Sequence, residues 1–184
     1  MNTHIGLIGA PGSGKDEIAK ILVEKHGFKR FAFADEIKKN YFLSIGITEA
    51  DFKSARHTER GFVWRRGLWE YSEKKKLEIG EDCFIAPVIN KIELLNSDAV
   101  ISDVRTFQEL KALRNIKSLF IIVVRDFEKD FSLGGPIIET KIDLKYLLGN
   151  AVVFNTGDLI DLNRKIDQMI KIVVLTKEIN GPER

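Results

Sequence analysis

Short apolar runs recur along the chain and predict buried strands. They are Ile5–Ile8, Arg30–Phe33, Ala99–Ser102, Leu119–Val124 and Ala151–Phe154. Runs that are apolar at successive positions, rather than at every second position, are typical of strands buried on both faces of a parallel sheet. The pattern therefore favours a parallel five-stranded sheet.

Segments with helical periodicity separate these runs. They are Lys15–His26, Asp35–Phe42, about Gly61–Leu77, about Asp82–Leu95, Phe107–Asn115 and Leu159–Val174. Gly27 is suited to end the first of them, because glycine readily adopts the left-handed conformation that closes a helix. Strands that alternate with helices predict an α/β fold with helices on both faces of the sheet, a three-layer αβα arrangement. A chain of 184 residues is long enough for one such domain, residues 1–184.

Two intervals contain no strand candidate. Residues 35–97 are rich in helix signals, and residues 126–150 have weak periodicity. At these positions they would form a helical substrate-binding region and a short lid, or simply two ordinary connections. The aromatic side chains of the first interval are interpreted as core residues rather than as groups that stack on a base: Phe62, Trp64, Trp69 and Tyr71.

Composition narrows the classes of partner. Lys and Arg total 29 against 27 Asp and Glu, so the net charge of +2 gives no basis for a nucleic-acid or membrane-surface partner. One cysteine, Cys83, cannot form an internal disulfide, and with three scattered histidines it forms no metal-binding pattern. No apolar stretch reaches the ~18 residues that a membrane-spanning helix needs, and no leader pattern opens the chain. We therefore expect a cytoplasmic protein.

The stretch "IGLIGAPGSGKDEIAK", residues 5–20, carries the clearest chemistry. It reads as a strand, a glycine-rich turn and the start of a helix, and it nearly fits the phosphate-loop pattern G-x-x-x-x-G-K-[ST]. In such a loop, consecutive backbone N–H groups and a helix N-terminus converge on an anion, and the lysine bridges the β- and γ-phosphates. The candidate ATP-binding residues are Gly9, Ala10, Pro11, Gly12, Ser13, Gly14 and Lys15.

Asp16 stands where the pattern has a serine or threonine that binds magnesium. A carboxylate can hold Mg²⁺ directly or through water, since this ion prefers oxygen ligands and keeps several waters. Alternatively, Asp16 only stabilises the helix, because an acidic residue in the first turn interacts favourably with the helix dipole. Both roles are compatible with the sequence.

A second acidic position, Asp103, follows the apolar run 99–102. It is expected at the carboxyl end of a strand, the edge where doubly wound sheets bind ligands. An aspartate there resembles the Walker B carboxylate that orients magnesium and its waters, and Arg105 is close enough to reach a phosphate. The alternative is that Asp103 caps the helix that begins near Phe107.

The chain resembles the P-loop nucleoside monophosphate kinases in its stretches Gly14-Lys15-Asp16 and Asp103-Val104-Arg105. It is most similar to the phage-type deoxynucleoside monophosphate kinases, in which aspartate follows the loop lysine. Animal phosphomevalonate kinases share this G-K-D feature. The resemblance implies a P-loop kinase fold with a helical acceptor-binding insertion at 35–97 and a lid at 126–150.

The acceptor site is implied by two stretches. "FAFADEIKK" looks like the family's second strand and following helix, which places Asp35 and Lys38 near the monophosphate. "RRGLWEYSEKKK" resembles the R-x-L-x-Q helix, with Arg66 as the arginine and Glu70 where glutamine is usual. Positions i and i+4 share a helix face, so Arg66 would hold the acceptor phosphate and Glu70 would face its base.

The C-terminal part resembles the family's lid glutamate, last strand and N-x-G-x-L-x-x-L helix. Glu139 matches the lid glutamate, and Asn155 and Gly157 match the turn close to the ATP base. Asn and Gly are also ordinary turn residues at a strand end. Residues 126–150 contain no arginine, which departs from kinase lids, so Arg125 is assigned to the transition-state charge.

The resemblance implies ATP-dependent phosphoryl transfer to a small-molecule acceptor, a (deoxy)nucleoside monophosphate, by a monomer or homodimer. The implied catalytic residues are Lys15, Asp103, Arg105 and Arg125, and Mg²⁺ would be held by Asp16 and Asp103, largely through water. The alternatives are another small-molecule P-loop kinase, with dephospho-coenzyme A, phosphomevalonate or a sugar-type acceptor, and a nucleotide-binding protein without catalytic activity.

Overall fold

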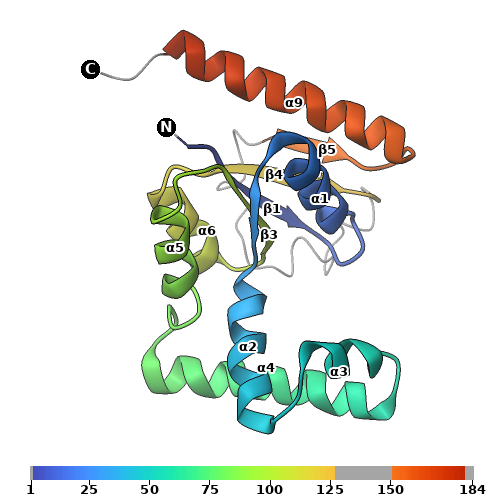
Figure 1. The fold of residues 1–184 in the computed structure, drawn as a ribbon, viewed down its shortest axis with the longest axis vertical. Coiled ribbons are helices and arrows are strands. Elements are labelled where there is room, and N and C mark those ends of the chain that lie inside the picture. The colour runs from blue at the N-terminus through green and yellow to red at the C-terminus, as the bar shows by residue number, and fades with distance from the viewer. Residues whose placement is uncertain (1, 127–150, 181–184) are drawn as a thin grey trace.

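The computed structural model describes residues 2–126 and 151–180 (Figure 1). Its strands are β1 (His4–Gly9), β2 (Lys29–Phe31), β3 (Ala99–Val104), β4 (Leu119–Val124) and β5 (Ala151–Phe154). The helices in these residues are α1 (Lys15–His26), α2 (Phe33–Ile45), α3 (Glu49–Ser54), α4 (Glu59–Ile79), α5 (Ala86–Glu93), α6 (Phe107–Asn115) and α9 (Leu159–Asn180).

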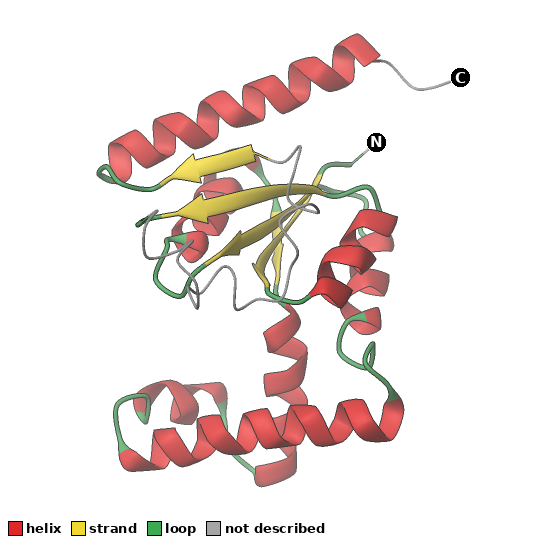
Figure 2. Ribbon diagram, turned by 180° about the vertical axis from the view of Figure 1, so that it is seen from behind, coloured by secondary structure: helices red, strands yellow, loops and turns green. Residues whose placement is uncertain are grey.

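The strands form one parallel sheet in the order β2-β3-β1-β4-β5 (Figure 2). All five predicted strands are present, and the order places β1 in the centre, between β3 and β4. The sheet of five parallel strands with helices on both faces confirms the predicted three-layer αβα fold.

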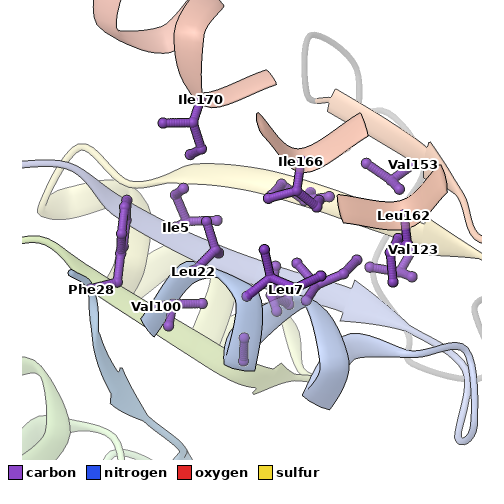
Figure 3. Close-up of a cluster of buried hydrophobic side chains, with 14 residues drawn as sticks. Ile5, Leu7, Leu22, Phe28, Val100, Val123, Val153, Leu162, Ile166 and Ile170 are labelled. Atoms are coloured by element: carbon purple, nitrogen blue, oxygen red, sulfur yellow. The ribbon is translucent and has the colours of Figure 1, made fainter. Parts of the chain in front are cut away.

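Each face of the sheet has its own apolar core. On one face, side chains of β1, β4 and β5 pack against α1 and α9, as Figure 3 shows for Leu7, Leu22 and Ile166. On the other face, side chains of β3 and β4 pack against α2, α5 and α6. Within β4, Ile121 and Val123 belong to the first core and Ile122 to the second, which explains why this run is apolar throughout.

Local differences from the prediction occur around β2 and α3. The second strand ends at Phe31 rather than at Phe33, because Ala32 already precedes the helix and Phe33 is its first residue. Helix α3 is absent from the prediction; it is six residues long and begins at a capping box formed by Thr48 and Asp51. Within the described ranges, no helix combines the length and hydropathy required to span a bilayer.

Helices α2, α3 and α4 form a helical arm, residues 33–79, which extends away from the sheet (Figures 1 and 2). A row of ring contacts joins them: Tyr41–Tyr71, Tyr41–Phe42, Phe42–Phe52 and Phe52–Trp64. Helix α4 crosses α2 closely at Gly67, where any Cβ would overlap the Tyr41 hydroxyl.

The prediction that the aromatic residues of this region are core residues is wrong for Phe62 and Trp69, while Trp64 and Tyr71 are half-buried and belong to neither apolar core. Trp64 and Tyr71 lie in the aromatic row on the inner side of α4. Phe62 and Trp69 are 64% and 65% exposed, because they lie on the face of α4 that turns away from α2 and α3. Aromatic residue type alone therefore does not distinguish the inner from the outer face of this helix.

Candidate functional site

The glycine-rich turn joins the carboxyl end of β1 to the first turn of α1. Gly12 and Gly14 have φ angles of 78° and 102°, in the left-handed region. The turn is closed by hydrogen bonds from Ser13 N to Ala10 O, 3.1 Å, and from Ile18 N to Gly14 O, 3.0 Å. This is the strand–turn–helix context that a phosphate loop requires, with the positive end of α1 at the turn.

Lys15 folds back across the loop. Its Nζ donates to the carbonyl oxygens of Gly9 and Ala10, each at 2.7 Å. The ammonium group therefore lies against the loop backbone, next to the region where the loop amides and the α1 N-terminus favour an anion.

Two residues from the ends of neighbouring strands also hold the loop. Asn155 follows β5, and its Nδ2 donates to Ser13 O at 2.8 Å. Arg125 follows β4, and its NH1 donates to Gly12 O at 3.1 Å. A Cβ at Gly14 would overlap the Asn155 amide, so the close approach of that side chain and the positive φ both favour glycine there. Gly157, the other residue of the predicted N-x-G turn, lies on the surface beside Asp161.

Asp103 lies at the carboxyl end of β3, as predicted, and is buried. Its Oδ1 accepts a hydrogen bond from Phe33 N at 2.9 Å, and its Oδ2 accepts one from Ala34 N at 2.8 Å. Burial raises the pKa of the carboxyl, while these two hydrogen bonds and the charge of Arg105 act in the opposite direction. The carboxylate therefore caps α2.

The alternative that Asp103 caps the helix near Phe107 is wrong. Thr106 is the N-cap of α6, and Glu109 completes a capping box with it. The Oε2 atom of Glu109 accepts from Arg105 N at 2.7 Å and from Thr106 N at 2.9 Å. Burial raises the pKa of Glu109.

A pocket of about 770 Å³ opens between the start of α1 and the helical arm. Its lining residues are Asp16, Arg30, Asp35, Lys38, Lys39, Phe42, Leu43, Ile47, Glu49 and Lys53. Asp35 is paired with Arg30 at 2.9 Å and with Lys38 at 3.3 Å. The pocket thus combines four cations, three carboxylates and an apolar wall.

The structure brings some predicted residues together and leaves others apart. Asp16, Asp35 and Lys38 share this pocket, whereas Arg105 is exposed and does not line it. Arg66 Nε donates to Glu70 Oε1 at 2.9 Å, so the two residues do share a helix face, but neither lines the pocket. Glu139 and nearly all of the predicted lid lie outside the described residues.

Sequence reasoning missed seven of the lining residues, three apolar and four charged; the charged ones are Arg30, Lys39, Glu49 and Lys53. One signal was available for the last two, because Thr48-x-x-Asp51 is a capping-box pattern that marks the start of a helix. That α3 forms one wall of the pocket has no such signal in the sequence.

The donors present fit a magnesium ion accompanied by phosphate. Asp16 offers an exposed carboxylate in the first turn of α1, immediately after the loop lysine. Mg²⁺ typically uses one or two carboxylates together with phosphate oxygens and waters, so it does not need a cage of protein ligands. The Ser13 hydroxyl is buried in the loop and has no hydrogen-bond partner among the residues that the structure describes.

No known family profile matches the chain. A curated relative, a UPF0200 protein from Sulfurisphaera tokodaii, is 28% identical over 123 residues, which cover 65% of this chain and 57% of the relative. The match therefore spans less than two thirds of that relative's length.

Solved structures share the fold over nearly the whole chain. Shikimate kinase from Aquifex aeolicus superposes with a TM-score of 0.53 at 14% identity, covering 95% of this chain and 100% of the kinase. A gluconokinase from Sinorhizobium meliloti superposes with a TM-score of 0.51 at 14% identity, covering 95% and 97%. The chain thus has the αβα fold of these two kinases, with a parallel five-stranded sheet and the glycine-rich turn after its central strand.

Proposed function

We propose that this protein transfers the γ-phosphoryl group of ATP to a small-molecule acceptor, a (deoxy)nucleoside monophosphate. The observation that carries the proposal is the continuity between the phosphate loop and the pocket. Lys15 lies on the loop, and the next residue, Asp16, is part of the pocket wall. A donor phosphate on the loop would therefore lie beside an acceptor in the pocket, and such positioning is the main requirement of phosphoryl transfer.

Each part of the loop has a role in this proposal. The loop amides and the N-terminus of α1 hold the β- and γ-phosphates, and Lys15 turns from the loop carbonyls toward them. Arg125, held at Gly12 O beside the loop, would stabilise charge on the transferring group. Magnesium neutralises phosphate charge when bound, and Asp16 is the exposed carboxylate that would hold it through water.

The pocket supports an anionic, partly apolar acceptor. Lys38 and Lys39 of α2 and Lys53 of α3 provide cations, and Phe42 with Leu43 provides an apolar surface for a base. No general base is required, because an oxygen of the acceptor phosphate is already an anion. The predicted roles of Arg66, Glu70 and Arg105 would require these side chains to move toward the pocket. The roles of Glu139 in the lid and of Gly157 near the ATP base stay predictions.

A second candidate acceptor carries a hydroxyl group instead of a phosphate. The observation that favours it is the presence of Asp16, Asp35 and Glu49 in the pocket wall, since a hydroxyl acceptor needs a carboxylate that accepts its proton. The two kinases of similar fold are named for shikimate and gluconate, which are hydroxy acids. This candidate corresponds to the sugar-type acceptor among the sequence-based alternatives.

A coupled ADP-release assay with Mg²⁺ distinguishes these acceptors. The panel contains the deoxy- and ribonucleoside monophosphates, dephospho-coenzyme A, phosphomevalonate, shikimate and gluconate. Turnover with a nucleoside monophosphate and with no hydroxy acid supports the proposal, and the reverse supports the second candidate. Nucleotide binding without transfer to any acceptor would favour a non-catalytic protein and contradict the proposal.

Lys15→Ala tests the assignment of the loop. Loss of the ammonium group should lower kcat by about a thousandfold, because it removes a charge that stabilises the transferring phosphate. Lys20→Ala is the matched control: it removes the same charge from the exposed side of α1 and should change kcat less than about twofold. Full activity in Lys15→Ala would show that the site is elsewhere.

A further inference from the structure

Helix α2 obtains its N-terminal cap from a distant strand. The residue at its N-cap position is Ala32, which has no side-chain acceptor. The first N–H groups of any helix lack partners within the helix, so they need an acceptor from elsewhere. Asp103 supplies it, since its two carboxylate oxygens accept from Phe33 N and Ala34 N at 2.9 and 2.8 Å.

The same contact fixes one wall of the pocket. Asp35 directly follows Ala34, and Lys38 lies about one turn further along α2; both line the pocket. The position and direction of the first turn of α2 therefore determine where these side chains stand. Asp103 sets that position because its two hydrogen bonds hold consecutive backbone groups, which restrains the helix end in rotation as well as in distance.

The turn that follows Asp103 is itself held by a residue of α6. The turn after β3 is closed by Glu109, whose Oε2 accepts from Arg105 N and Thr106 N at 2.7 and 2.9 Å. The carboxyl end of β3 is thus fixed to α6 on one side and to α2 on the other. Such a support is the arrangement by which a remote residue keeps a binding wall in place.

The surroundings of Asp103 differ from those of Asp16. Asp103 is 9% exposed and each of its oxygens accepts a backbone hydrogen bond, so its negative charge already faces the positive end of α2. Asp16 is exposed and lines the pocket. A hydrated magnesium ion needs an accessible carboxylate, and of these two residues Asp16 provides it.

We propose that Asp103 is a positioning residue that docks the first turn of α2, and with it the acceptor pocket, onto the sheet, and that it does not hold magnesium. This inference rests on the proposed function in one respect, the identity of the pocket as the acceptor site. It replaces the Walker B role predicted from the sequence.

The test uses Asp103→Asn and, as the matched variant, Asp16→Asn. Asparagine keeps the shape but turns an amide NH₂ toward one of the two α2 amides, so one hydrogen bond to a charged group is lost. The KM for the acceptor should rise roughly tenfold or more, with kcat and the KM for ATP changed less than about twofold. The Mg²⁺ concentration for half-maximal activity should rise in Asp16→Asn and stay unchanged in Asp103→Asn.

A second readout needs no enzymatic activity. Hydrogen exchange at the amide that faces the new NH₂ group, Phe33 or Ala34, should become at least about tenfold faster in Asp103→Asn, and exchange at neither amide should change in Asp16→Asn. The Mg²⁺ dependence of ADP binding, measured by calorimetry, should be unchanged in Asp103→Asn. If no acceptor is phosphorylated by the unmodified protein, the proposed function fails, and these two measurements still decide the role of Asp103.

Ala34→Pro provides a second variant in case Asp103→Asn does not fold. It removes the N–H that Oδ2 accepts, at a first-turn position where proline is tolerated. It should raise the acceptor KM in the same way, and should speed exchange at Phe33. Unchanged exchange at both Phe33 and Ala34 in Asp103→Asn, or a raised Mg²⁺ requirement in that variant, would overturn the proposal.

Discussion

The sheet core and the helical arm are stabilised in different ways. Leu7 and Leu22 of the core are fully buried between the sheet and its helices. In the arm, the 21-residue helix α4 buries only Gly61 and Ser72, and it is held by ring contacts and by its close crossing with α2. The core therefore carries most of the apolar burial that stabilises the fold, while the arm mainly shapes the pocket.

A first prediction tests this division with two leucine truncations. Leu22→Ala in the core should lower the free energy of unfolding by about 2–5 kcal/mol, because it leaves a cavity among closely packed side chains. Leu43→Ala in the arm should lower it by less than about 0.5 kcal/mol, since that side chain is 75% exposed. Urea denaturation followed by circular dichroism measures both, and equal losses would remove the distinction between core and arm.

The two tryptophans of α4 sharpen the comparison within the arm. Trp64→Ala should lower the free energy of unfolding by about 2 kcal/mol, because its ring stacks on that of Phe52 with 6.4 Å between the two ring centroids. Trp69→Ala should lower the free energy of unfolding by less than about 0.5 kcal/mol, as expected for an exposed side chain. Thermal unfolding compares the two variants. A large loss in Trp69→Ala would indicate that this face of α4 is covered in solution.

A smaller effect on the free energy of unfolding is expected at Glu109, in the first turn of α6. Burial raises the pKa of Glu109 in the folded state above its ordinary value of 4.5, so the folded protein binds more protons than the unfolded one. The contribution of Glu109 to stability is therefore present at low pH and is lost as the pH rises from 4.5 through the raised pKa. Glu109→Gln can keep both hydrogen bonds, because one oxygen accepts both, and it removes this titration.

The measurement for Glu109→Gln is the free energy of unfolding between pH 4 and pH 8. Its decline with rising pH should be shallower in the variant than in the unmodified protein. An identical slope in the Glu109 variant would show that its carboxyl titrates as it does in the unfolded chain.

The sheet and the loop were predictable because their signals are local. Strands β1 and β4 are continuous apolar runs, and the loop is a contiguous motif at the end of one of them. The prediction was weaker for the arm, where helix α3 was missed and Phe62 and Trp69 turned out to be exposed. In a helix that packs on one side only, inner and outer positions depend on neighbours that the sequence does not name.

For a related reason, the sequence did not identify the helix that Asp103 caps. The residue was placed correctly at the end of β3, and an acidic residue there fits either a metal or a helix cap. The helix that it caps lies 69 to 70 positions earlier in the chain, so the choice depended on which helix end the sheet order brings to β3. Sheet order is set by long-range pairing, which local patterns do not contain.

The hydrogen bond from Asn155 to Ser13 has a consequence for the chain during its synthesis. The loop is synthesised well before one of its supports, because the Asn155 contact comes from a residue 142 positions later. At ribosomal rates of about 5–20 residues per second, that delay is on the order of 10 s. Until then a nascent chain presents a loop without this support, which becomes available only when β5 and the residue after it have been made.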